Sequence, residues 1–304
     1  MKEILVTGAF GFIGRHVAKA ASQNGYYVVG LGHGSWGREE WRHWGLSDWR
    51  NAEVDVESLI TYAGLPDTII HCAGSGSVAF SVTNPVQDFR RTVDGTLSVL
   101  EFIRINSPGT RLVLPSSAGV YGVVEQLPIS TGARLNPASP YGVNKKIAEE
   151  LCKSYSQHFG LRASIVRLFS VYGRGLRKQL LWDACVKLSN ENGTFFGTGV
   201  ETRDWIHVDD AAKLLLTAVD HASSDCPIAN GGTGSGVPIR DVLAALSSAL
   251  GYRGTLEFNG LVRSGDPQHY IADISESLEW GWKPERDLTS ELKNYADWFK
   301  LERP

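Results

Sequence analysis

The stretch that most constrains the fold is an apolar run followed by evenly spaced glycines at the start of the chain. Residues 3–7 form a short apolar run of the kind that becomes a buried parallel strand. Gly8, Gly11 and Gly14 follow at intervals of three, and an amphipathic segment continues to about Asn24. Glycines allow a tight turn and a close approach of the backbone to a pyrophosphate, to which the start of a helix presents unpaired N–H groups. This order of strand, turn and helix predicts a dinucleotide-binding α/β fold.

The chain continues with alternating short apolar runs and amphipathic segments. We expect strands at residues 3–7, 26–31, 67–71, 111–115 and 163–168. The amphipathic segments 85–105 and 141–159 are expected to be helices. This alternation predicts an α/β fold with a Rossmann-type doubly wound parallel sheet, whose ligands collect at the carboxyl ends of the strands. We place an NAD(P)-binding domain at 1–168 and a smaller substrate lobe at 169–304. The two are expected to interleave, because residues 203–218 could return to the edge of the sheet.

The end of the second predicted strand bears on the choice of cofactor. A strict NAD site usually carries an acid there, which binds the ribose hydroxyls. This chain has His33 between two glycines, with no carboxylate in the stretch that follows the strand. Since nothing would then repel a 2′-phosphate, which His33, Ser35 or Arg38 could hold, we expect NAD or NADP, with a slight preference for NADP. The predicted cofactor-binding residues of the strand ends are Gly8, Gly11, Phe12, Ile13, Gly14, His33, Asp55, Val56, Ala73 and Gly74.

Four tryptophans lie close together in residues 36–49, mixed with arginines and acids. One interpretation is an aromatic flap near the adenosine. We favour the other, in which the tryptophans anchor a loop or a short helix on the domain through their large apolar surface.

Composition excludes several classes of protein. The formal net charge of −3 argues against a general nucleic-acid-binding surface. The four cysteines are widely separated, without a Cys-x-x-Cys pair, and the histidines have no metal-ligand spacing, so we expect neither a disulfide scaffold nor a metal site. No apolar run has the length of a signal peptide or a membrane span, so we expect a cytoplasmic protein. A hydrolase is a poor fit because there is no Gly-x-Ser-x-Gly motif.

A tyrosine and a lysine stand four positions apart at the start of the second predicted long helix. Tyr141 and Lys145 would then share one face, so that the ammonium could favour the ionised phenol. Tyrosine needs such help as a base, because its ordinary pKa is about 10. Ser117 follows the strand at 111–115, where a hydroxyl can donate to and accept from a substrate hydroxyl. A Tyr-x-x-x-Lys pair alone is common on helices, so its order relative to the other motifs matters.

Taken together, the glycine turn, Ser117, the Tyr141–Lys145 pair and the strand that follows them resemble the extended short-chain dehydrogenase/reductases. The resemblance is specifically to the NAD(P)-dependent nucleotide-sugar epimerase/dehydratase family, and it runs through nearly the whole chain. It implies that Tyr141 is the acid/base, that Lys145 holds the nicotinamide ribose and lowers the tyrosine pKa, and that Ser117 assists the tyrosine. It also implies that helices 85–105 and 141–159 pair with a second copy in a homodimer, although their apolar faces alone would equally fit a position in the core.

The C-terminal part carries similar motifs for the substrate. Arg203 stands in a stretch similar to the family's Arg-Asp-Phe/Tyr-x-His-Val-x-Asp, whose arginine meets a diphosphate, and Arg263 stands in an Arg-x-Gly-Asp segment. Two arginines from separate segments suit a pyrophosphate, because each is always charged and can bind two oxygens. The resemblance therefore implies a nucleotide-diphosphate sugar as substrate. Its predicted contacts are Ser117, Ser170, Arg203, Arg263 and Tyr270.

The resemblance leaves several activities open. Dehydratases of the family carry acids after the catalytic Ser/Thr, where this chain has Ala118 and Gly119, and elimination of water needs an acid and a base. Dehydration is therefore disfavoured. We favour an epimerase at the sugar's fourth carbon, acting through a 4-keto intermediate, over an NADPH-dependent reductase of a nucleotide-linked 4-keto-6-deoxy sugar. A non-catalytic NADP-sensing relative is the third alternative, and the presence of Ser117, Tyr141 and Lys145 argues against it.

Overall fold

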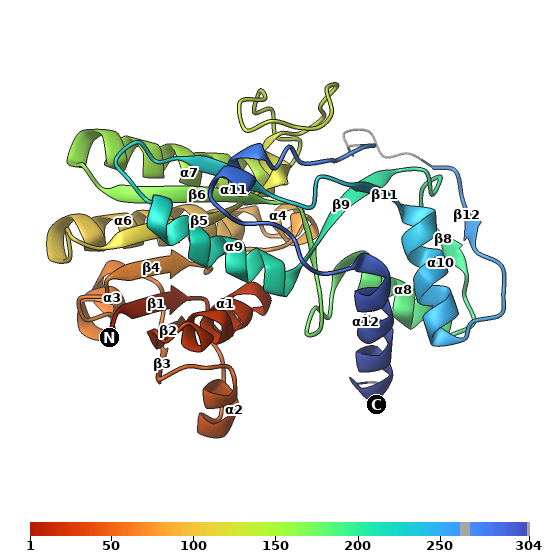
Figure 1. Ribbon diagram of the computed structural model, residues 1–304, viewed down its shortest axis with the longest axis horizontal. Coiled ribbons are helices and arrows are strands. Elements are labelled where there is room, and N and C mark those ends of the chain that lie inside the picture. The colour runs from red at the N-terminus through yellow and green to blue at the C-terminus, as the bar shows by residue number, and fades with distance from the viewer. Residues whose placement is uncertain (262–267, 303–304) are drawn as a thin grey trace.

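The structure is a computed structural model that describes residues 1–261 and 268–302. Its larger part is a seven-stranded parallel sheet covered by helices, and a smaller part lies beyond the carboxyl ends of the strands (Figure 1). In sheet order the strands are β3 (Asp48–Asn51), β2 (Tyr27–Gly32), β1 (Glu3–Thr7), β4 (Thr68–His71), β5 (Arg111–Ser117), β6 (Arg162–Leu168) and β10 (Ile228–Gly231). This order confirms the predicted Rossmann-type doubly wound sheet.

The point where the strand order reverses lies between β1 and β4. β1 pairs with β2 on one side and with β4 on the other, so that Thr7 lies beside both Leu31 and His71. Crossover connections leave the sheet in opposite directions from this point and open a crevice at the carboxyl ends of the strands. The fold therefore places a ligand site beside the turn after β1.

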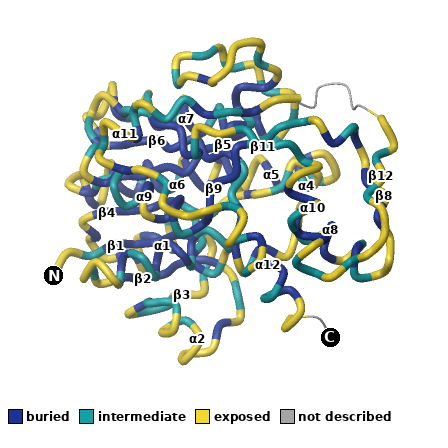
Figure 2. Tube along the Cα trace, turned by 45° about the vertical axis from the view of Figure 1, so that its right-hand side comes forward, coloured by how far each residue is buried: buried dark blue, intermediate teal, exposed yellow. Residues whose placement is uncertain are grey.

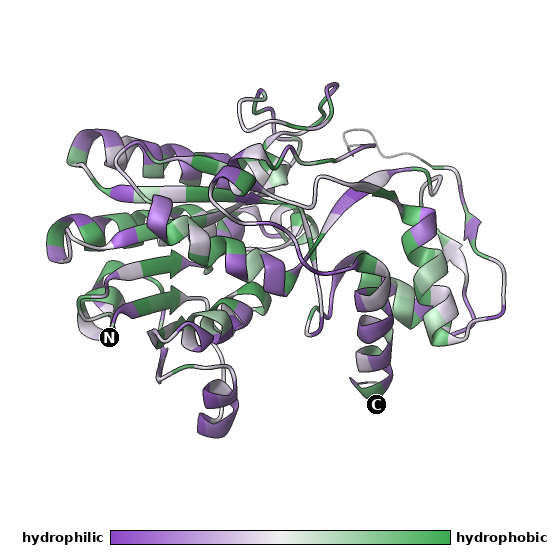
Figure 3. Ribbon diagram, viewed as in Figure 1, coloured by the Kyte–Doolittle hydropathy of each residue, from purple (hydrophilic) through white to green (hydrophobic). Residues whose placement is uncertain are grey.

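Helices cover both faces of the sheet. One face is covered by α1 (Phe12–Gln23) and α9 (Val208–His221), which pack against each other. The other face is covered by α3 (Val56–Tyr62), α6 (Gly95–Asn106) and α7 (Pro140–Phe159). Because both faces are buried, the central strands are almost continuously apolar, as Figures 2 and 3 show. Among the described residues, no helix is both long enough and apolar enough to cross a membrane.

The smaller part has its own sheets and its own apolar core. A three-stranded sheet contains β7 (Ser170–Tyr172), β9 (Thr202–His207) and β11 (Gly236–Pro238), and β8 (Thr194–Phe195) pairs with β12 (Glu257–Phe258). Its helices are α8 (Gln179–Ser189), α10 (Ile239–Leu250) and α12 (Leu288–Glu302), whereas α11 (Ser275–Glu279) packs against β10 of the larger part. Buried aromatic and aliphatic side chains of α8, α10 and α12 form the core, among them Leu181, Leu243, Tyr295 and Phe299.

The chain does not remain in the smaller part once it has left β6. It crosses through β7, α8, β8 and β9 and then returns, since α9 packs on α1 and β10 pairs with β6. The single long helix expected at 85–105 is not continuous α-helix. It consists of α5 (Pro85–Phe89), a π-helical turn (Arg90–Asp94) and α6, and the short helix α4 (Val78–Thr83) precedes it.

The tryptophan-rich segment forms the short helix α2 (Arg38–His43) and its flanks. The Trp36 side chain is buried, and its ring meets Phe10 at 5.2 Å and Trp49 at 5.4 Å between centroids. The Arg15 guanidinium lies over the Trp44 ring at 5.2 Å, a cation–π contact. These contacts confirm that the tryptophans anchor the segment on the domain.

Candidate active site

A cavity of about 810 Å³ lies between the carboxyl ends of the sheet and the smaller part. Its walls come from the turn after β1, the ends of β4 and β5, the start of α7, and β7, α8 and β9. The predicted site residues that line it are Gly11, Phe12, Ile13, Gly14, Gly74, Ser117, Tyr141, Lys145, Ser170 and Arg203. Segments far apart in the sequence therefore meet in one space.

The glycine turn after β1 is too tightly packed for side chains. Gly8 has a φ of 69°, and a Cβ atom there would lie 2.6 Å from the backbone nitrogen of Ala73. A Cβ on Gly14 would lie 2.3 Å from the carbonyl oxygen of Gly8. Gly8 and Ala73 thus form the packing beneath the turn, whereas Gly11 and Phe12 line the cavity at the start of α1. The N-cap residue of α1 is Gly11, which has no side chain to cap the helix, and the first turn contains no acid, so the N–H groups there suit a phosphate.

The start of α7 fixes the position of Tyr141. Ser139 is the N-cap and accepts a hydrogen bond from the N–H of Gly142 at 3.2 Å, and Pro140 occupies the first turn, where it needs no N–H partner. A Cβ on Gly142 would lie 2.4 Å from the carbonyl oxygen of Gly119. Only glycine permits this approach, which brings the first turn of the helix against the loop after β5.

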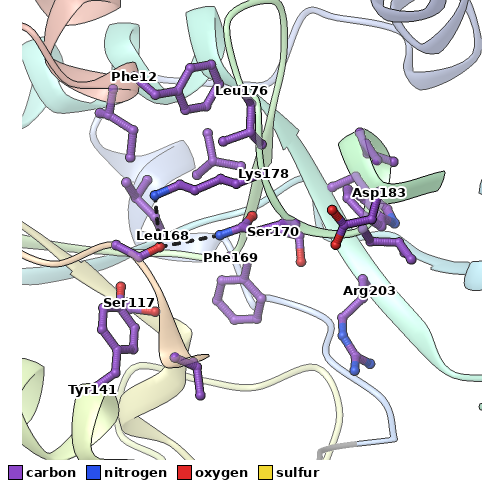
Figure 4. A pocket seen from close by; sticks show the side chains of 18 of the residues that line it. Phe12, Ser117, Tyr141, Leu168, Phe169, Ser170, Leu176, Lys178, Asp183 and Arg203 are labelled. Atoms are coloured by element: carbon purple, nitrogen blue, oxygen red, sulfur yellow. Dashed lines mark hydrogen bonds between the residues drawn. The ribbon is translucent and has the colours of Figure 1, made fainter. Parts of the chain in front are cut away.

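That approach brings Ser117 and Tyr141 together. Ser117 is the last residue of β5, and its Oγ accepts a hydrogen bond from the N–H of Gly119 at 3.1 Å. A Cβ on Gly119 would lie 3.4 Å from Ser117 Oγ and 3.6 Å from the Tyr141 ring. Figure 4 shows the two side chains next to each other at one end of the cavity. A substrate hydroxyl placed there would meet a second hydroxyl and a phenol.

The electrostatics of this end differ from the sequence expectation in one respect. Lys145 is buried, and its Nζ donates to the carbonyl oxygen of Pro115 at 3.0 Å. Burial also raises the pKa of Tyr141, because it disfavours the phenolate, whereas the interaction with Ser117 lowers that pKa. The predicted lowering of the tyrosine pKa by Lys145 is therefore not seen in this arrangement, in which the ammonium is directed to Pro115.

The predicted substrate residues have three different outcomes. Ser170 in β7 and Arg203 in β9 lie on neighbouring strands and line the cavity. The Nη1 of Arg203 donates to the carbonyl oxygen of Thr202 at 2.9 Å. Tyr270 does not line the cavity, because its hydroxyl donates to the carbonyl oxygen of Gly122 at 2.5 Å and its ring packs in the adjoining core. Arg263 lies outside the described residues.

Three predicted cofactor residues lie at the ends of β2 and β3, outside the cavity lining. Asp55 caps α3, accepting from the N–H of Ser58 at 2.7 Å, and Val56 is the first residue of that helix. His33 is exposed, and its Nε2 lies 2.7 Å from Oε2 of Glu53. The stretch that follows β2 has no carboxylate of its own, but Glu53, from the loop after β3, places one beside His33.

The cavity also contains charged residues that the sequence analysis did not single out. Lys178 precedes α8, and Asp183 and Lys187 lie on it. The spacing of Asp183 and Lys187 at i and i+4 places them on one helix face, which is a pattern the sequence displays. Lys178 stands in an irregular segment, so no periodicity points to it.

Comparisons with known proteins agree with this geometry. A sequence model of the NAD dependent epimerase/dehydratase family matches residues 4–229. The chain belongs to this family. As a family member it is 32% identical over 308 residues to a putative UDP-glucose 4-epimerase of Methanocaldococcus jannaschii, covering 98% of each chain.

Two solved structures are similar to this epimerase/dehydratase family member over 99% of its chain. One is the UDP-glucose 4-epimerase of Thermotoga maritima with UDP-glucose, at 27% identity and a TM-score of 0.88, with 99% of that chain covered. The other is the UDP-glucuronic acid 4-epimerase of Bacillus cereus in complex with UDP-glucuronic acid and NAD, at 26% identity and a TM-score of 0.87, with all of that chain covered.

Proposed function

We propose that the protein is an NAD-dependent nucleotide-diphosphate-sugar epimerase that inverts the fourth carbon of a UDP-linked sugar. The observation that carries the proposal is the convergence of Ser117 and Tyr141 at one end of a cavity that also contains the glycine turn and Arg203. Relatives of known structure carry out this reaction on UDP-sugars, which supports the epimerase over the 4-keto-sugar reductase.

The residues present fit a dinucleotide. The turn at Gly8 and Gly14 leaves no room for a Cβ, and the uncapped start of α1 directs N–H groups toward the place of a pyrophosphate. Lys145 and Tyr141 would adjoin the nicotinamide ribose. Bound there, NAD would accept a hydride from the sugar's fourth carbon and return it to the opposite face.

The chain's own residues handle the proton. Tyr141 takes the proton of the 4-hydroxyl as the carbon–oxygen double bond forms, and it returns a proton to that oxygen after the 4-keto sugar has turned over. Ser117 holds the oxygen by a hydrogen bond. The raised pKa of Tyr141 favours the phenol, so the positive charge of an oxidised nicotinamide is what would help it to ionise.

We infer NAD rather than NADP as the cofactor. The Glu53 carboxylate, 2.7 Å from His33, lies beside the end of β2, where the adenosine ribose is expected. A carboxylate accepts hydrogen bonds from ribose hydroxyls and repels a 2′-phosphate. The sequence favours NADP only in so far as no carboxylate follows β2 directly along the chain.

We further infer that the protein acts in the cytoplasm as a homodimer. Apolar side chains are exposed on α4, α5 and α7, where a second copy could cover them. They include Val82 at 63%, Val86 at 62%, Phe89 at 41% and Val143 at 42% exposure. Sedimentation analysis of the native protein and of Val86→Glu should show a dimer and a monomer respectively, and a native monomer would contradict the inference.

Product analysis tests the proposed reaction. The purified protein is incubated with NAD and, separately, with UDP-glucose, UDP-glucuronate and UDP-N-acetylglucosamine, and the products are separated by chromatography. We expect one of these sugars to interconvert with its 4-epimer without net formation of NADH. Consumption of reduced cofactor only with a 4-keto sugar would overturn the epimerase in favour of the reductase.

A further inference from the structure

The segment between β7 and α8 reaches across the cavity to the loop after β4. The Nζ of Lys178 donates to the carbonyl oxygen of Gly76 at 3.3 Å, and the Nε2 of Gln179 donates to the same oxygen at 3.4 Å. Gln179 has a φ of 66°, in the left-handed region that residues other than glycine rarely adopt. A strained residue and two donors to one carbonyl oxygen thus join the smaller part to the sheet.

The Lys178 ammonium lies so close to Gly76 that it leaves little room for a side chain at that position. Gly76 lines the cavity near Gly74, and a Cβ on it would lie 3.2 Å from the Nζ of Lys178. Figure 4 shows the Lys178 side chain extended across the cavity, between Phe12 and Ser117 in this view. The cavity wall formed by the loop after β4 therefore has a positive charge beside it that comes from Lys178, in the segment between β7 and α8.

The ammonium of Lys178 has unused hydrogen-bonding capacity. It carries three N–H donors, and one of them is directed to the carbonyl oxygen of Gly76 at the long distance of 3.3 Å. Within the described ranges 1–261 and 268–302, no carboxylate lies within 4.0 Å of its Nζ. Surrounding protein atoms lower the pKa of Lys178 by desolvation. The residue nevertheless stays exposed and lines the cavity. An anion placed beside it would favour the charged ammonium and so offset the cost of that desolvation.

We propose that Lys178 is an anion-binding residue that contacts a negatively charged oxygen of the bound ligands. That oxygen belongs either to a phosphoryl group of the dinucleotide, whose pyrophosphate site begins at Gly11 and Phe12, or to the nucleotide sugar. The proposal rests on the proposed function for the identity of the ligands. Because Lys178 comes from the smaller part and Gly76 from the sheet, the contact also makes ligand affinity depend on how the two parts are joined.

Direct binding measurements on variants test the proposal. Lys178→Met removes the charge at similar length, and Lys178→Arg keeps it. Lys293→Met is the control, since Lys293 is an exposed lysine of α12 that pairs with Asp297. NAD and, separately, UDP-glucose and UDP-glucuronate are titrated against each full-length protein by calorimetry. Thermal unfolding of each variant shows whether it is folded.

We expect Lys178→Met to lower the affinity for at least one ligand by about tenfold, the effect of losing a charged hydrogen bond. Lys178→Arg should lower that affinity less. Weaker binding of NAD assigns the oxygen to the dinucleotide. Weaker binding of both UDP-sugars assigns it to the nucleotide diphosphate, and weaker binding of UDP-glucuronate alone assigns it to a sugar carboxylate. Affinities of a folded Lys178→Met that match those of Lys293→Met for all three ligands would overturn the proposal.

Binding is measured without turnover, so the two proposals can fail separately. A native protein that binds NAD but interconverts no UDP-sugar would contradict the proposed function alone. The NAD titration of Lys178→Met would still decide whether Lys178 binds an anion of the dinucleotide.

Discussion

Arg167 and Glu149 form a bidentate ion pair in the interior, with Nε–Oε1 at 3.0 Å and Nη2–Oε2 at 2.7 Å. Glu149 lies on α7, two turns after Tyr141, and it also accepts a hydrogen bond from Ser116 at 2.5 Å. The pair therefore fastens the helix that carries Tyr141 to β6, and through Ser116 to the strand that ends at Ser117. One buried network therefore holds the elements that carry Tyr141 and Ser117, the two proposed catalytic residues.

Breaking this pair should destabilise the fold. The side chains are 2% and 0% exposed, so Arg167→Met leaves the Glu149 carboxylate buried without its partner. We expect a loss of about 3–5 kcal/mol in the free energy of unfolding, measured by urea denaturation. The control Lys293→Met breaks an exposed, solvent-screened pair and should cause a much smaller loss. Equal losses in the two variants would show that the buried pair adds nothing beyond an exposed one.

Removal of the phenol should abolish catalysis without preventing cofactor binding. For Tyr141→Phe we expect a fall in kcat of about 10²–10⁴, the usual contribution of a general acid–base group. NAD affinity, measured by calorimetry, should stay close to that of the native protein, because the ring remains. Undiminished turnover in this variant would exclude Tyr141 as the acid/base.

The Ser117 hydroxyl should shift the pH dependence. Its interaction lowers the pKa of Tyr141, which burial raises, so Ser117→Ala should raise that pKa further. Because the first step needs the phenolate, the ascending limb of kcat/KM against pH should move to higher pH in the variant. Complete pH–rate profiles of both proteins would measure this. A profile lowered at every pH without displacement would assign Ser117 a positioning role only.

Asp209 should stabilise the fold near neutral pH and lose this effect in acid. Its hydrogen bond with His16, 2.8 Å long, is the main cause that lowers the pKa of this carboxyl from 3.8 to about 2. A lowered pKa in the folded state stabilises the fold above pH 3.8, and this contribution disappears as the pH falls toward 2. Unfolding midpoints measured between pH 5 and about 2 should fall less steeply for Asp209→Asn than for the native protein. Parallel curves would contradict this role.

Glu53 should discriminate between the cofactors. Glu53→Gln removes the carboxylate beside His33, so binding of NADP should tighten relative to NAD by about twofold to fivefold, the size expected for exposed charges. Glu57→Gln, an exposed acid on α3, is the matched control. Dissociation constants of both dinucleotides give the ratio. A ratio unchanged from the control would mean that Glu53 does not adjoin the 2′ position.

Local patterns predicted the sheet well and its edge poorly. All five expected strands are present within one or two residues of their predicted bounds, because apolar runs bounded by glycine and polar residues specify buried parallel strands. β10 was missed because it is only four residues long and contains Asn230 and Gly231. Asn230 is nevertheless fully buried, where its Oδ1 accepts from the Tyr121 hydroxyl at 2.6 Å. A partner 109 positions away in the sequence gives no local pattern.

The residues of the candidate site also differ in whether the sequence alone could predict them. The glycine turn and the Tyr141–Lys145 pair are local motifs, so their spacing was visible in the sequence. Glu53 and Lys178, for which we propose roles in ligand binding, lie 20 and 102 positions from His33 and Gly76, which they contact. Their positions follow from the packing of the two parts, which spacing along the chain does not reveal.

The chain returns to the large sheet through α9 and β10. Folding of the first 168 residues therefore depends on residues far later in the sequence. A fragment ending at Leu168 would leave an edge of the sheet unpaired at β6 and bare the apolar face that α9 covers on α1. Residues 1–168, the proposed cofactor-binding domain, are therefore not expected to fold as an independent unit. A chimera that takes all residues after β6 from a relative, in order to change substrate preference, would also replace α9 and β10. The sheet of the recipient would then be covered and paired by foreign elements.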